Sequence, residues 1–171
     1  MTHLLRLRRK LCRELAQSER DARLHTRREA RRLGEVPPAL ALRAIAAHAD
    51  GMRPRFEALV GREQPIGTLL AYTVAAMFSG VRHALLDRMI DRERSYRATL
   101  LGLYHGVDVA RLLRDVCVRA GDRYVARFCD ELVAERSVLL DQAQHALAWF
   151  ADAPQQALRS GARGALATSR S

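Results

Sequence analysis

Several features that mark specialised protein classes are missing from this sequence of 171 residues. The longest nearly apolar run, Leu69 to Phe78, spans about ten residues, whereas a membrane-spanning helix needs about twenty. The three cysteines contain no C-x-x-C pair, so neither a zinc ribbon nor a disulfide framework is indicated. Glycine-rich phosphate loops and the G-x-S-x-G nucleophile elbow are also missing. We therefore expect a cytoplasmic protein that is not an enzyme, with no catalytic residue and no cofactor.

Aromatic residues and lysine are scarce as well. Aromatics make up 5% of the chain, and Lys10 is the single lysine among 29 basic residues. The remaining composition is rich in alanine, leucine and arginine, with 49% hydrophobic residues and a net charge of +10. That apolar content is too high for a disordered chain, and the length suits one domain. The composition favours a single, basic, helical domain.

Glycine and proline are few, and they divide the chain into long helical segments. Gly34 and Pro38 separate the first two segments, in the order that helix ends and helix starts prefer. Pro54 lies inside the second segment without changing its helical phase, so we expect a kink there. We also expect a bend near Arg92 to Ser95 in the fourth segment. The predicted helices are about Thr2–Leu33, Pro38–Val60, Ile66–Phe78, Val81–Ala120 and Asp122–Ala151.

Apolar residues recur at helical spacing along these segments, and strand patterns are missing. In the first helix Leu4, Leu11, Leu15, Ala22, Thr26 and Leu33 share one face, and a similar face runs from Val125 to Phe150. Such faces require a common core. We predict an all-α fold, a four-helix bundle with an additional short connecting helix, over residues 1–153. Residues 154–171 have no amphipathic order and are predicted to form a flexible tail.

Three segments carry a resemblance to a known family. They read E-L-A-Q-S-E-R-D-A-R-L in the first helix, A-A-H-A-D in the second and C-D-E-L-V-A-E-R-S-V-L-L-D in the last. In this pattern, and in the order of its helices, the chain from Leu11 to Ala151 resembles the ferritin-like superfamily, especially its small bacterial stress-associated branch. Metal-binding members hold two metals with carboxylates and Glu-x-x-His motifs. The resemblance implies that Glu19 and Glu135 match single carboxylate ligands and that His48 matches a ligand of the second helix.

The sequence departs from that pattern in two ways. It contains no Glu-x-x-His motif. Arg136 points nearly into the core, where its positive charge would repel a divalent ion. A buried arginine requires a carboxylate, so we expect Arg136 to pair with Glu19 or Glu29. We therefore predict that the di-metal site is lost.

Basic residues follow the outer face of the first helix. This arginine stripe has no acid within it and costs stability unless something negative lies opposite. The first helix carries a net +7, whereas the chain from Asp122 to Asp152 carries −3, so part of the compensation can be internal or across a dimer. A polyanion is another candidate, and a solvated surface is the simplest alternative. The stripe contains Arg6, Arg9, Arg13, Arg20, Arg27 and Arg31.

Three functions follow as hypotheses. The leading one is a non-enzymatic structural or interaction protein that self-associates as a homodimer, with its metal centre replaced by packing and ion pairs. The second is a stress-associated protein with a weak iron or manganese site. The third is an anion-binding or nucleic-acid-binding protein that uses the arginine stripe.

Overall fold

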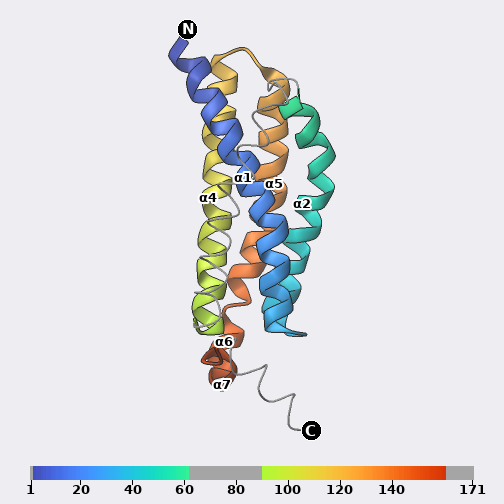
Figure 1. Cartoon of the computed structure of the whole chain (residues 1–171), viewed down its shortest axis with the longest axis vertical. Helices are drawn as coiled ribbons and strands as arrows, with labels where there is room; N and C mark the ends of the chain where they lie inside the picture. The colour runs from blue at the N-terminus through green and yellow to red at the C-terminus, as the bar shows by residue number, and fades with distance from the viewer. Residues whose placement is uncertain (1, 62–89, 161–171) are drawn as a thin grey trace.

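The computed structural model describes residues 2–61 and 90–160 (Figure 1). Within these two ranges the regular elements are all helices, and the β-type contacts amount to one isolated bridge between Asp91 and Ser160. The all-α class predicted from the sequence is therefore confirmed. The helices are α1 (Thr2–Leu33), α2 (Pro37–Gly61), α4 (Arg92–Arg119), α5 (Arg123–His145), α6 (Ala148–Asp152) and α7 (Pro154–Ala157).

The four long helices pack side by side. α1 lies between α2 and α4, and α5 lies against the same two helices on the other side. Adjacent helices run in opposite directions: Glu14 and Glu29 of α1 contact His105 and Ser95 of α4, in reversed order along the chain. α2 and α4 consequently run in the same direction, so α2 ends and α4 begins at opposite ends of the bundle (Figure 1).

Local sequence explains where the long helices end. Gly34 after α1 and Gly121 after α4 have φ angles of 87° and 76°, a left-handed conformation that glycine adopts without strain. The Asp122 side chain then accepts a hydrogen bond of 3.1 Å from the Val125 backbone amide and caps α5. α1 has the bounds predicted from the sequence, and α2 continues through Pro54 as expected.

Two clusters of buried residues fill the bundle along its length. One contains Leu42, Ile45 and Tyr96, and its Tyr96 hydroxyl donates a 2.8 Å hydrogen bond to the Ala143 carbonyl. The other contains Leu11, Leu15, Leu113, Phe128 and Leu132. Because both clusters draw on all four long helices, a substitution in either one affects the packing of the whole bundle.

The last long helix is shorter than the sequence predicts. The prediction extended it to Ala151, but α5 ends at His145 and α6 begins only at Ala148. The break turns the chain so that the Phe150 ring lies 5.4 Å from the Tyr96 ring, centroid to centroid. No glycine or proline stands at the break, so it arises from tertiary packing and leaves no local signal in the sequence.

The start of the predicted tail also differs. Pro154–Ala157 forms α7, Ala157 is buried, and the Arg92 amide donates a hydrogen bond to the Arg159 carbonyl. These residues therefore belong to the end of the bundle rather than to a flexible tail. α4 begins at Arg92, where the bend was expected. The helix predicted at 66–78, the segment 81–89 and the tail residues 161–171 lie outside the described residues.

No helix within residues 2–61 and 90–160 is both long enough and apolar enough to cross a membrane.

Candidate functional site

Arg136 is the centre of a polar network inside the bundle. Its side chain is 3% exposed, and it lies one turn along α5 from the buried Leu132. The guanidinium Nη2 donates to Oε2 of Glu19 on α1 at 2.9 Å, and Nε donates to Nδ1 of His48 on α2 at 3.1 Å. One buried cation therefore joins three helices.

His48 extends this network toward the surface. Its Nε2 lies 2.9 Å from Oε2 of Glu135, whose side chain is 57% exposed. Because Nδ1 accepts from Arg136, the proton of the neutral ring is on Nε2, which donates to Glu135. Burial, together with the charge of Arg136, lowers the pKa of His48, although Glu135 and Glu19 oppose the shift. The imidazole is therefore held neutral as a bridge between the guanidinium and an exposed carboxylate.

Helical geometry explains why neighbouring residues of α5 have opposite environments. Consecutive helical residues point about 100° apart, so Arg136 faces the core while Glu135 stays at the rim of α5. Arg136 as a whole residue, backbone included, is 2% exposed, as its helical phase relative to Leu132 predicts. Of its two expected partners, the structure brings Glu19 to it and leaves Glu29 elsewhere.

These residues do not fit a di-metal centre. Glu19, His48 and Glu135 do lie in one network, but the Arg136 guanidinium stands between Glu19 and His48. The His48 nitrogen that faces the core already accepts a hydrogen bond from that cation. In the part of the chain that the structure describes, no group of three or more histidine, cysteine, aspartate or glutamate residues is arranged to hold a metal ion. In the described residues, these side chains form an ionic network around Arg136.

Glu29 forms a second buried network near the start of α4. Its side chain is 2% exposed and receives two hydrogen bonds, of 2.7 and 2.9 Å, from Arg32 one turn further along α1. The Ser95 hydroxyl donates to the same carboxylate at 3.0 Å, and Thr99 lies one turn further along α4, 3.2 Å from His25. Sequence reasoning missed Arg32 as the partner, although its i, i+3 spacing from Glu29 is a recognisable signal.

The arginine stripe lies on the outside of α1. All six of its arginines are exposed. Arg27, however, forms an ion pair with Asp50 of α2, and Arg23 lies 3.9 Å from the same carboxylate. Arg13 and Arg31 donate only to backbone carbonyls of the preceding turn, at 3.3 Å. Asp50 therefore removes one member of the stripe and leaves five without a carboxylate partner among the described residues.

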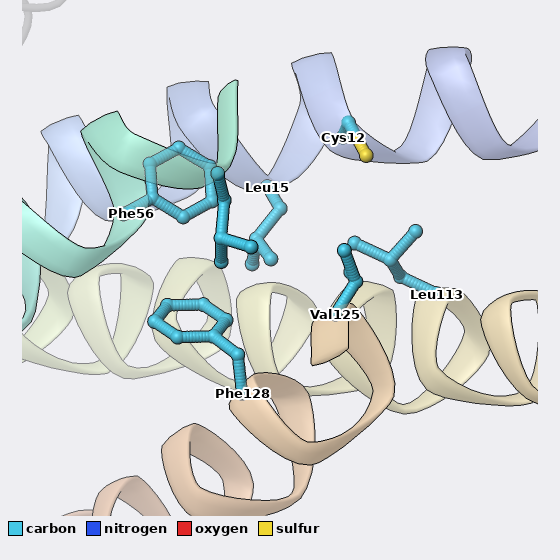
Figure 2. A pocket seen from close by; sticks show the side chains of 7 residues that line it. Cys12, Leu15, Phe56, Leu113, Val125 and Phe128 are labelled. Carbon is cyan, nitrogen blue, oxygen red and sulfur yellow. The ribbon is translucent and has the colours of Figure 1, made fainter. Parts of the chain in front are cut away.

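Within the described residues, the three cysteines lie in or beside the apolar core. Cys117 and Cys129 are buried, and burial raises the pKa of the Cys129 thiol to about 12. Cys12 lies at a small hollow that side chains from α1, α2, α4 and α5 line (Figure 2). The other side chains around the hollow are apolar: Leu15, Phe56, Leu59, Leu113, Val125 and Phe128.

No known family model matches this chain, and neither a curated protein nor a solved structure gives a significant match.

Proposed function

We propose that the chain is a ferritin-like bundle in which an ionic network replaces the di-metal centre, and that it acts as a non-enzymatic structural or interaction protein. The observation that carries this proposal is the Arg136 guanidinium between Glu19 and His48. A fixed positive charge at that position opposes the binding of a divalent cation, and arginine cannot lose its proton to relieve the conflict.

The helix directions support the ferritin-like part of the proposal. Ferritin-like bundles have one long crossover connection, which joins two helices that run in the same direction. Here α2 and α4 run in the same direction, and their connected ends lie at opposite ends of the bundle (Figure 1). In an up-and-down bundle with short loops, consecutive helices would be antiparallel throughout.

Self-association as a homodimer is part of the same proposal. Three apolar side chains of α4, at i, i+3 and i+11, are exposed on one face: Leu101, Tyr104 and Leu112. Sedimentation of the full chain at several concentrations tests this part, and a monomer at all of them would overturn it.

A weak iron or manganese site is the competing function. It is favoured by one observation, namely that Glu19, His48 and Glu135 meet in one network. A small rearrangement of Arg136 would leave two carboxylates and an imidazole near one another. The two functions therefore differ in a measurable quantity, the metal content of the protein.

The test is metal analysis of the full chain after purification without chelator. We expect far less than one iron or manganese per chain, unchanged by Glu19→Gln or Glu135→Gln. Asp141→Asn provides the matched control, because Asp141 is an exposed acid on the same helix as Glu135. Stoichiometric iron or manganese that disappears in Glu19→Gln or Glu135→Gln but persists in Asp141→Asn would overturn the proposal.

A further inference from the structure

We propose that the outer face of α1 binds the phosphate backbone of double-stranded nucleic acid without reading its sequence. The binding surface is the five arginines that remain after Arg27 pairs with Asp50. We call this set the cationic face: Arg6, Arg9, Arg13, Arg20 and Arg31. It lies on the side of α1 away from the core, so binding here and the ferritin-like assignment can fail independently.

Two sets of arginines on α1 have different surroundings. Arg8, Arg23 and Arg32 face neighbouring helices or the core, and each lies within ion-pair distance of a carboxylate. None of the five arginines of the cationic face has a carboxylate partner within the described ranges, and Lys10 and Arg28 beside them have none either. Positive charges in the first turns of a helix also oppose its dipole. The cationic face therefore lowers the stability of α1 unless an external anion binds it.

The cationic face is long and nearly straight, a shape that suits a duplex. Arg6 and Arg31 are 25 residues apart on one continuous helix, which corresponds to about 38 Å at 1.5 Å per residue. α1 extends along the length of the bundle (Figure 1). A duplex presents one negative charge per about 1.7 Å of its axis, so a linear row of guanidinium groups can contact several phosphates at once. Arginine is suited to this contact because its planar fork binds phosphate oxygens in pairs.

The residues of α1 favour a duplex over a membrane surface and over a single strand. A helix that lies on a membrane buries a continuous apolar face among the acyl chains. The apolar face of α1 is occupied by the core, through Leu11, Leu15 and Leu33. Its three exposed leucines point in different directions around the helix and form no second apolar face: Leu5, Leu7 and Leu24. Single-stranded nucleic acid is held by aromatic side chains on which bases stack, and α1 contains no phenylalanine, tyrosine or tryptophan. A duplex, whose phosphates lie on the outside, needs neither feature.

In a dimer, the cationic face of one molecule could instead lie against the acidic α5 of a second molecule. α5 is the most acidic part of the sequence, but three of its four acids already have partners. Glu131 pairs with Arg55 and Asp130 with Arg114, at 3.3 Å in the second case, while Glu135 binds His48. The acidic helix therefore offers little free charge to the cationic face of a second molecule, which leaves an external polyanion as the better complement.

The test is a salt titration of binding to a fluorescent duplex of about 20 base pairs and arbitrary sequence, with the full chain. Five phosphate contacts predict a slope of about −4.5 for the logarithm of the association constant against the logarithm of the salt concentration. Affinity would then fall about 500-fold between 50 and 200 mM salt. The triple variant Arg9→Ala, Arg13→Ala, Arg20→Ala keeps two contacts, so its slope falls to about −1.8 and the loss to about 12-fold.

A charge-matched variant controls for the overall charge of the protein. Arg114→Ala, Arg123→Ala and Arg127→Ala together remove the same charge from α4 and α5, and we expect the native slope. The melting temperature of each variant shows whether it folds, and Arg9→Gln with Arg20→Gln provides a milder substitution of the same surface. Equal losses in the two triple variants would overturn the proposal, as would no binding at low salt.

Three other ligands provide the remaining outcomes. Tighter binding to a single strand of the same length would overturn the duplex proposal in favour of a single-strand surface. Tighter binding to phosphatidylserine vesicles would overturn it in favour of a membrane surface. A dimer at low salt that the Arg9, Arg13 and Arg20 triple variant dissociates would overturn it in favour of a second copy of the chain.

Discussion

The bundle contains two buried charged networks that are built in opposite ways. In one, the buried group is a cation, Arg136, and its partners Glu19 and His48 belong to two other helices. In the other, the buried group is an anion, Glu29, and its main partner Arg32 is on the same helix, with Ser95 of α4 as the second partner. The first network depends on the correct packing of three helices, whereas the ion pair of the second needs only that α1 is helical.

The chemistry of the buried group adds a second difference. A guanidinium stays charged under all ordinary conditions, so Arg136 cannot escape the cost of burial when a partner is removed. A carboxyl group can take up a proton and become neutral. Removal of a partner therefore need not leave an unpaired buried charge at Glu29, as it does at Arg136. The Arg136 network should consequently be the more sensitive to substitution and the more important for the register of the helices.

The largest expected effect is that of Glu19→Ala. It leaves a buried guanidinium with only the neutral His48 as partner, and loss of one member of a buried ion pair costs about 3–5 kcal/mol. Urea unfolding at neutral pH measures this loss. Asp21→Ala is the matched control, because it removes an exposed carboxylate of the same helix, for which we expect a change within about 0.5 kcal/mol. A Glu19→Ala cost no greater than the control would refute the special role of this pair.

A double replacement tests the same pair from the other side. Glu19→Leu combined with Arg136→Met removes both charges and fills the space with apolar groups. Because well-packed apolar replacements of buried ion pairs are often neutral or stabilising, we expect unfolding free energy close to that of the native chain. A double variant as unstable as Glu19→Ala would show that packing, rather than the unpaired charge, causes the loss.

A smaller effect is expected for Arg32→Ala in the second network. Glu29 keeps its hydrogen bond from Ser95 and can become neutral, so the loss should be about 1–3 kcal/mol, the range for an incompletely satisfied buried group. Arg28→Ala, on the exposed side of the same turn, is the control and should change stability by less than about 0.5 kcal/mol. If urea unfolding gives Arg32→Ala a greater cost than Glu19→Ala, the contrast between the two networks is wrong.

The sequence predicts the parts of this molecule that depend on local signals. Gly34 and the prolines that follow it determine where α1 ends and α2 begins, and both were predicted closely. The end of α5 is predicted less well: the helix ends at His145 without a glycine or proline, and beyond it Phe150 packs against Tyr96, which is far away in the chain. Local preferences cannot report a tertiary contact of this kind.

The same limit applies to the polar networks. The phase of α5 is enough to predict that Arg136 is buried. The phase does not predict which carboxylate pairs with Arg136, because Glu19 and Glu29 are ten residues, or about 15 Å, apart along α1. That choice depends on the register between α1 and α5, two helices that lie diagonally across the bundle. The role of His48 as an acceptor for Arg136 was missed for the same reason, since the side chains come from different helices.

The smallest expected effect is a pH dependence of stability that arises in the Arg136 network. The pKa of His48 lies below its ordinary value of 6.5 in the folded chain, first because the ring is buried and then because Arg136 is charged. Between about pH 6.5 and the lower folded value, the unfolded chain binds a proton that the folded chain does not, so the free energy of unfolding falls as pH falls. At higher pH the ring is neutral in both states, and this contribution to stability is fully present.

Urea unfolding of the native chain and of His48→Gln, at about pH 7.5 and about pH 5.5, measures this contribution. Glutamine can still accept a hydrogen bond from Arg136 and donate one to Glu135, but it has no proton to gain in this range. We therefore expect the stability of His48→Gln to change less with pH than that of the native chain. His145→Gln is the control: His145 is exposed on α5 and contacts only the Asp141 carbonyl, so its pH dependence should match the native one. A pH dependence of His48→Gln equal to that of the native chain would mean that proton uptake by His48 is not coupled to unfolding, and the two networks would then differ only in how they respond to the loss of a partner.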